Sequence, residues 1–202
     1  MSGPPRGPIV RRQQSEARAA RPLKIVVTGP FAAGKTSLIK TISEVTVLGT
    51  EREISDETRS RKETTTVAMA FGRLSRPDGL ALFLFGTPGQ RRFEVMWEVL
   101  SEGMIGFVLL VDATDPRSAT EAASVLETFR EYADVPFVVG VTHLEEAVDP
   151  ETALADVRTG LGLDDEDDVL ACDPRCREDV KALLLRILFG VLRRLERVPA
   201  GT

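Results

Sequence analysis

The segment from Gly29 to Thr36 reads Gly-Pro-Phe-Ala-Ala-Gly-Lys-Thr, and this spacing of two glycines, a lysine and a hydroxyl restricts the possible folds of the chain more than any other feature. A short apolar run, Leu23–Thr28, directly precedes it, and residues 33–42 have the apolar spacing of a helix. At such a strand–loop–helix junction, successive backbone N–H groups form a concave nest, and the first helical turn adds unpaired donors. The pattern therefore predicts a loop that binds polyphosphate.

Each residue type in this loop has a physical role. Gly29 and Gly34 permit a tight turn and let phosphate oxygens approach the backbone without a Cβ atom in the way. Lys35 is expected to reach the β- and γ-phosphates, which makes it a candidate catalytic residue, and the hydroxyl of Thr36 is expected to ligate Mg²⁺. The alternative is a glycine-rich turn with a surface lysine. The predicted nucleotide-binding residues of the loop are Gly29, Pro30, Phe31, Ala32, Ala33, Gly34, Lys35, Thr36 and Ser37.

Short apolar runs alternate with helical stretches along the rest of the chain. Strands that are apolar on both faces are typical of a mainly parallel sheet covered by helices on both sides. A turn signal at 76–79, between the runs 64–74 and 80–85, predicts a hairpin with one antiparallel edge strand. Residues 45–62 show no apolar stripe and are expected to form an irregular connection. Further strands are expected at 105–111, 136–141 and 169–172, and helices at 91–102, 117–132, 150–159 and 177–196.

The chain has 202 residues, with 26 Lys and Arg against 31 Asp and Glu and a net charge of −5. These values fit one globular domain, residues 23–196, and argue against nucleic-acid binding, which needs a basic surface. Residues 1–22 are interpreted as a disordered basic, proline-rich tail, with membrane contact as an alternative, and residues 197–202 as a short tail. Neither a membrane helix nor a secretory signal is predicted, so a cytoplasmic location is expected. Cys172 and Cys176 are interpreted as plain thiols.

A second cluster, Phe85-Gly86-Thr87-Pro88-Gly89-Gln90, follows an apolar strand. In an open parallel sheet, loops beyond the carboxyl ends of the strands line the ligand crevice, so this loop is expected beside the phosphates. Gly89 can offer its N–H to a γ-phosphate. Gln90 is predicted to be catalytic, because a neutral amide can orient an attacking water by accepting from it and donating to the phosphoryl oxygens.

Together these two motifs resemble those of the small Ras-like GTPases, and most of all the bacterial MglA-type and actinobacterial conservon-type members. The resemblance covers about residues 23–195 and implies a three-layer P-loop NTPase fold, with a six-stranded sheet, one antiparallel edge strand and five helices. It also implies a molecular switch that is ordered with GTP and relaxed with GDP. By position, Thr66 matches the switch threonine that ligates Mg²⁺, with Thr65 one register away as the alternative.

Gly86 departs from this family pattern. The typical Ras-like protein has an acidic residue there, whose carboxylate holds the waters of Mg²⁺. We expect Mg²⁺ to bind less tightly in its absence, unless Asp112 at the end of a later strand helps through water.

The base-binding motifs depart further. The family's Asn-Lys-x-Asp corresponds to Thr142-His143-Leu144-Glu145, in which Glu145 can accept the two N–H donors of guanine. Thr142 is a weaker substitute for asparagine, and His143 either covers the base as a flat ring or is a plain loop residue. Guanine is the expected base, with relaxed or adenine preference as the alternative, because the wrong base would leave the carboxylate unpaired. The last family motif corresponds to Asp173-Pro174-Arg175, where the backbone of Asp173 and Pro174 is expected to contact the base.

The expected function is a switch that binds GTP or GDP with Mg²⁺ and hydrolyses GTP slowly. A nucleotide-binding scaffold without hydrolysis is the alternative suggested by Gly86, although Lys35, Thr36 and Gln90 count against it. A small-molecule kinase is disfavoured, because the segment 113–135 lacks the clustered arginines of a substrate lid.

The resemblance also implies a partner, a Roadblock-type regulatory protein at the switch regions. Met96, Trp97 and Val99 are candidates for its contact surface, with packing onto the sheet as the alternative for two of the three. Arg59 or Arg61 is a candidate arginine finger supplied in cis.

Overall fold

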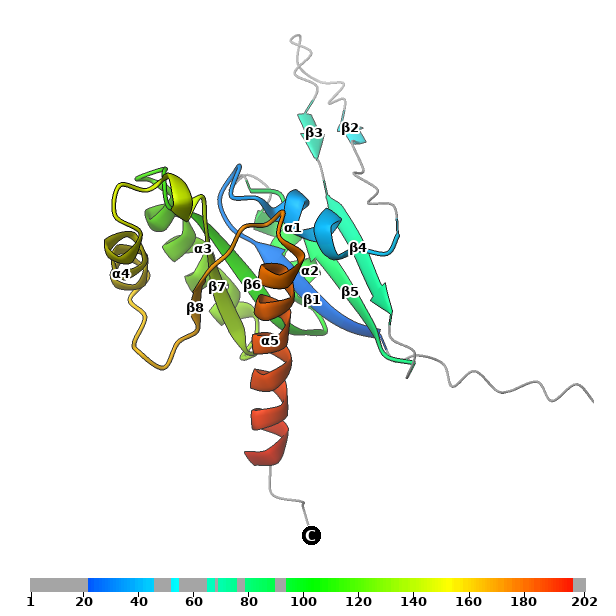
Figure 1. Ribbon diagram of the computed structural model, residues 1–202. Helices are drawn as coiled ribbons and strands as arrows, with labels where there is room; N and C mark the ends of the chain where they lie inside the picture. The colour runs from blue at the N-terminus through cyan, green and yellow to red at the C-terminus, as the bar shows by residue number, and fades with distance from the viewer. Residues whose placement is uncertain are drawn as a thin grey trace, which may run out of the picture.

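The computed structural model describes residues 22–45, 52–54, 65–67, 69–75, 79–89 and 94–197. Within these residues, six strands form one sheet in the order β4-β5-β1-β6-β7-β8 (Figure 1). Neighbouring strands are parallel, except that β4 and β5 form an antiparallel hairpin at one edge. The strands are β1 (Pro22–Thr28), β4 (Ala70–Ser75), β5 (Ala81–Gly86), β6 (Met104–Asp112), β7 (Phe137–Thr142) and β8 (Val169–Ala171).

Helices cover both faces of this sheet, so the predicted three-layer α/β class is confirmed (Figure 1). Helices α1 and α5 bury Leu38 and Leu183 on one face. Helices α2, α3 and α4 lie on the other face, where Trp97 and Phe129 pack with ring centroids 6.0 Å apart. The helices are α1 (Lys35–Ile42), α2 (Glu94–Ser101), α3 (Ser118–Tyr132), α4 (Pro150–Gly160) and α5 (Arg177–Arg197), with a short 3₁₀ helix η2 (Leu144–Glu146).

The central strand β1 shows why the sequence there is continuously apolar. Successive side chains of a strand point to opposite faces of the sheet. Ile25 and Val27 therefore join the cluster under α1 and α5, while Val26 joins the cluster under α2 and α3. All three side chains are fully buried, because both faces are covered.

The segment before the β4–β5 hairpin differs from the sequence expectation. Residues 52–54, expected in an irregular connection, form strand β2 (Arg52–Ile54), which pairs antiparallel with β3 (Thr65–Val67). The single strand expected at 64–74 is two strands, since β4 begins only at Ala70. The physical reason lies in the partner strand: Ala70 pairs with Gly86, the last residue of β5, and Thr65–Val67 pair with β2 instead.

The parallel order places several loops at one end of the molecule. Strand β1 ends at Thr28 and β5 at Gly86, while Asp112 of β6 pairs with Thr142, the last residue of β7. Loops at the carboxyl ends of such strands form the usual ligand crevice of open α/β sheets. Among the described helices, none is long and apolar enough to cross a membrane.

Candidate functional site

The loop between β1 and α1 is shaped by three residues with positive φ. These are Gly29 at 138°, Ala32 at 63° and Gly34 at 92°. Gly34 is also the residue that caps the N-terminus of α1. Ala32 was not anticipated: an alanine in the left-handed region costs roughly 1–2 kcal/mol, and such strain is found mostly at functional sites. The backbone therefore turns tightly from the strand into the helix, as a phosphate-binding nest requires.

Lys35 begins α1 and folds back over this loop. Its side chain is buried, and Nζ donates hydrogen bonds to the carbonyl oxygens of Gly29, at 2.9 Å, and Pro30. Burial lowers the pKa of Lys35 to about 8. A buried ammonium held by neutral carbonyls gains strongly from a nearby anion, so the loop concentrates positive potential where phosphate would lie.

The remaining loop residues differ in their exposure. Phe31, Ala32, Thr36 and Ser37 are exposed, whereas Pro30 and Ala33 are buried. Thr36 stands in the first turn of α1, where its exposed hydroxyl is accessible to a ligand.

The loop after β5 lies directly against the phosphate loop. A Cβ atom built on Gly89 would lie 2.7 Å from the backbone nitrogen of Phe31 and 2.9 Å from Lys35 Nζ. The same loop is fixed to β1, because the Thr87 amide donates to the carbonyl oxygen of Val27 at 3.0 Å and the Thr87 hydroxyl donates to the hydroxyl oxygen of Thr28 at 2.9 Å. The structure thus brings Gly89 and Lys35 together. Gln90 lies outside the described residues.

Trp97 of α2 also belongs to this region, although its sequence signal was ambiguous. It is buried, and its indole Nε1 donates to the carbonyl oxygen of Pro88 at 3.1 Å. Trp97 is therefore part of the core and Met96 is half-buried, while Val95 and Val99 are exposed one helical turn apart. Of the three candidates for a partner surface, only Val99 is exposed.

Gly86 has a packing role that explains the missing acidic residue. A Cβ atom there would lie 2.9 Å from Ile39 Cδ1 and 3.1 Å from the Cβ of Ala70. The space beside Gly86, where the Ras-like pattern has an acidic side chain, is thus filled by apolar side chains of α1 and β4. Asp112, the proposed substitute, accepts hydrogen bonds from the Thr114 amide and hydroxyl and lies 3.2 Å from His143 Nδ1.

The metal-binding prediction concerns two threonines. Thr66 lies in β3, paired with Glu53 of β2, and the structure describes neither its side chain nor that of Thr65. Arg59 and Arg61 lie outside the described residues. Within the described ranges, no group of three His, Cys, Asp or Glu side chains is able to hold a metal ion. The exposed hydroxyl of Thr36 nevertheless fits Mg²⁺, which usually takes only one or two protein ligands and otherwise binds phosphate oxygens and water.

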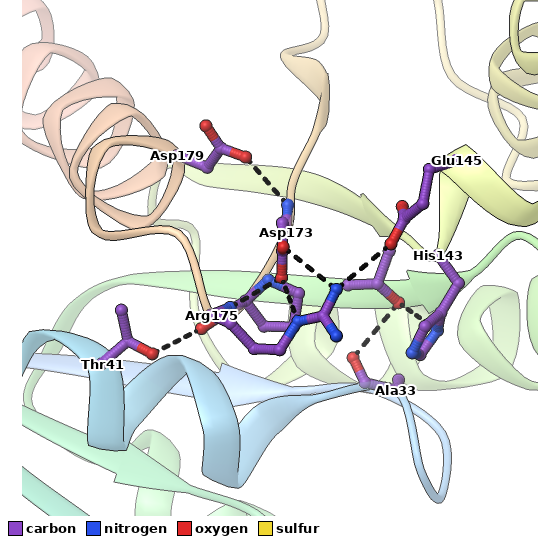
Figure 2. A network of polar contacts seen from close by, with 9 residues as sticks. Ala33, Thr41, His143, Glu145, Asp173, Arg175 and Asp179 are labelled. Carbon is purple, nitrogen blue, oxygen red and sulfur yellow. Dashed lines mark hydrogen bonds and ion pairs between the residues drawn. The ribbon is translucent and has the colours of Figure 1, made fainter.

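The loops that follow β7 and β8 meet through Glu145, Arg175 and Asp173 (Figure 2). Thr142, fully buried, donates weakly to the carbonyl of Ala33 at 3.4 Å and so links β7 to the phosphate loop. His143 has a positive φ of 55°, which turns the chain into η2. Glu145 on η2 is exposed.

The loop after β8 contacts α1 directly. A Cβ atom on Gly34 would lie 2.9 Å from Pro174 Cγ, and the Pro174 carbonyl accepts a 2.7 Å hydrogen bond from the hydroxyl of Thr41. The Asp173 amide donates to Asp179 of α5 at 2.9 Å. The base-side residues predicted from sequence therefore lie together beside the phosphate loop.

Arg175 is the residue that sequence reasoning missed. Its guanidinium donates to both carboxylate oxygens of Asp173 and, at 3.3 Å, to Glu145 Oε1 (Figure 2). These hydrogen bonds also hold the pKa of the Asp173 carboxyl below its ordinary value. The only available signal was its position in the segment that replaces the family's last motif.

Comparison with known proteins identifies a family for this arrangement. Residues 27–183 match a family model described as a conserved hypothetical ATP-binding protein. The matched range begins in β1 and ends in α5, so it spans the phosphate loop, the loop after β5 and the base-side loops. No curated protein matches the chain.

Proposed function

The chain belongs to the family of conserved hypothetical ATP-binding proteins and is a nucleotide-binding protein with a P-loop-like site, and from that premise we propose that it is a GTP-driven molecular switch of the Ras-like type. The observation that carries the proposal is the approach of Gly89 to Lys35 and Phe31. A loop this close to the phosphate cradle senses whether a γ-phosphate is present, because its backbone must move to accommodate one.

A displacement of the loop after β5 would also reach the protein surface. Pro88 is bound by Trp97, so displacement of the loop is transmitted to α2, on which Val95 and Val99 are exposed. We propose this helix as part of the contact for a Roadblock-type regulatory partner, as the resemblance to MglA-type and conservon-type GTPases implies. An exposed apolar pair on a helix coupled to the phosphate loop suits a partner that distinguishes the two nucleotide states.

Guanine is the base we propose, and Glu145 is the reason. Guanine presents two adjacent N–H donors that a single carboxylate can accept, whereas the corresponding edge of adenine presents one donor beside an acceptor. Glu145 lies on η2, shortly after the end of β7, and β7 is linked to the phosphate loop through Thr142 and Ala33. A carboxylate so placed would be left unpaired by adenine, which costs binding energy.

Hydrolysis is assigned to the residues at the phosphate end. Gln90 orients a water that attacks the γ-phosphorus, the bond to the bridging oxygen breaks, and GDP and inorganic phosphate leave. Lys35 neutralises charge on the β- and γ-phosphates throughout. Mg²⁺, held by Thr36 and Thr66, would supply further charge neutralisation on the phosphate oxygens.

ATP binding without a switch is the second candidate. The family description and the pairing of Glu145 with Arg175 favour it, because a neutralised carboxylate no longer selects guanine. A non-hydrolysing scaffold with relaxed base specificity is the corresponding variant, favoured by Gly86.

Nucleotide identity and phosphate release separate these functions. We expect guanine nucleotide to co-purify with the protein, identified by mass spectrometry, and phosphate to be released slowly from GTP but not from ATP. Gln90→Ala should abolish release while leaving GTP affinity unchanged. Turnover of ATP alone would contradict the switch, and tight binding of either nucleotide without turnover would support the scaffold.

A further inference from the structure

Arg175 contacts the carboxylate of Glu145, which the proposed function assigns to binding of the base. Its Nε donates to Asp173 Oδ1 at 2.8 Å and its Nη2 to Asp173 Oδ2 at 3.1 Å, a bidentate pair. The same Nη2 reaches Glu145 Oε1 at 3.3 Å, so that one guanidinium bridges two acids from different loops (Figure 2). The longer contact is the one to Glu145.

The position of Arg175 is fixed by its backbone. Its amide donates to Asp173 Oδ1 at 2.8 Å, and the preceding carbonyl, that of Pro174, is bound by Thr41 of α1. The Asp173 amide is bound by Asp179 of α5. Helices α1 and α5 thus hold the backbone of this loop in place beside the phosphate loop. The guanidinium itself is exposed.

The chemistry of the two possible partners of Glu145 is the same. A guanidinium presents a planar fork of N–H donors, and the N1–H and N2–H₂ groups of guanine form an equivalent fork. Arg175 contacts Oε1 alone, whereas the fork of guanine would use both oxygens of Glu145, so the two donors compete at Oε1. Because Arg175 keeps its bidentate pair with Asp173 when it leaves Glu145, releasing the carboxylate costs it only the weaker contact.

We propose that Arg175 determines the base specificity of this site by competing with guanine for the Glu145 carboxylate. With Arg175 on Glu145, the charge of the carboxylate is neutralised and Oε1 is occupied, so guanine loses much of its advantage over adenine. With Arg175 on Asp173 alone, the site selects guanine. This inference rests on the proposed nucleotide switch and adds to it a residue that sets how strongly GTP is preferred.

The test compares the affinities for GDP and ADP. Because both nucleotides carry the same phosphates, the contribution of the phosphates to binding cancels in their ratio. Fluorescent GDP and ADP analogues are titrated against wild type, Arg175→Gln, Glu145→Gln and the double variant. Arg194→Gln is the matched control, because Arg194 makes a 2.8 Å ion pair with Asp134, before the amino end of β7 and away from the site. Arg175→Lys keeps the charge and removes the fork.

The expected result is specific to competition. Arg175→Gln should raise affinity for GDP about two- to fivefold, the range of an exposed ion pair, and leave affinity for ADP unchanged. Glu145→Gln should lower affinity for GDP about tenfold, and Arg175→Gln should have no further effect in that background. Arg175→Lys should fall between wild type and Arg175→Gln. Raising the salt concentration should increase the GDP preference of wild type but not of Arg175→Gln, since the exposed pair is screened.

The contrary results are distinguishable. If Arg175→Gln weakens GDP binding, or leaves it unchanged while Glu145→Gln weakens it, the competition is refuted and the guanine site stands. If Glu145→Gln leaves GDP affinity unchanged, guanine selection by this carboxylate fails and the competition fails with it. If wild type binds neither analogue, the proposed function itself fails.

Discussion

The indole nitrogen of Trp97 is bound to the carbonyl oxygen of Pro88, 3.1 Å away, and both residues are buried. This hydrogen bond joins helix α2 to the loop whose next residue, Gly89, lies against Lys35. Trp97 is also the single tryptophan of the chain. The residue that binds the loop after β5 is thus also a fluorescent reporter of that loop.

The intrinsic fluorescence of Trp97 should therefore report the nucleotide state. We expect a difference in emission intensity or wavelength between the GDP complex and the complex with a non-hydrolysable GTP analogue, because the proposed switch moves the loop carrying Pro88 when a γ-phosphate is added. Trp97→Phe removes the signal and serves as the blank. Identical emission spectra in the two complexes would show that the loop does not respond.

Removal of the Lys35 ammonium should abolish tight nucleotide binding. We expect Lys35→Ala to lower affinity for GTP and ATP alike by about 10- to 100-fold, the loss of a charge-assisted hydrogen bond to phosphate. Isothermal titration measures this directly. Lys40→Ala, which removes an exposed lysine from the last turn of the same helix, is the control and should bind like wild type.

The lowered pKa of Lys35 predicts how stability depends on pH. The pKa is about 8 in the folded protein and has its ordinary value of 10.5 in the unfolded chain, so between these values the unfolded state binds more protons. The free energy of unfolding of the nucleotide-free protein should therefore rise with pH across this window, by a few kcal/mol at most, and show no such slope below pH 8. Urea unfolding of wild type and Lys35→Met at pH 7, 9 and 10 isolates the contribution of Lys35. If the free energies of unfolding of the two proteins change with pH in parallel, Lys35 makes no such contribution.

Nucleotide affinity should change with pH in the opposite direction. Phosphate binds the charged form of Lys35, so affinity should fall as the pH rises above about 8. Titrations with a fluorescent nucleotide between pH 7 and 9.5 measure the fall. A flat profile for wild type would show that Lys35 stays protonated in the free protein.

Gly34→Ala tests the contact between the phosphate loop and the base-side loop. A Cβ atom at this position would meet the Pro174 ring at 2.9 Å, on a backbone with φ of 92°. Gly162→Ala is the matched control: its φ is 63°, but nothing lies within 4 Å of the new atom. We expect both variants to lose about 1 kcal/mol of stability through backbone strain, and only Gly34→Ala to lose nucleotide binding.

Much of this fold could be predicted from the sequence, for identifiable physical reasons. The strand β6 is buried on both faces and so reads as one apolar run, and α3 shows a clear helical period because its other side faces solvent. The phosphate loop was recognisable because its chemistry requires glycines and a lysine at fixed spacing.

The rest depended on contacts that leave no local pattern. Strand β2 is three residues long and carries no periodicity, and among the described residues it pairs with β3. Arg175 is one of 21 arginines in the chain, and nothing local distinguishes it from the others. Its importance comes from Glu145, which lies 30 positions away along the chain and meets it only in the folded sheet.

The contacts of Pro174 with Gly34 and Thr41 also have a consequence for folding during translation. Thr41 emerges from the ribosome 133 residues before the carbonyl that it binds. Until β8 and the following turn have been translated, α1 lacks this support and Gly34 has no ring beside it. A nascent chain stalled before Val169 should therefore capture no nucleotide, and ligand-assisted folding can begin only when translation is nearly complete.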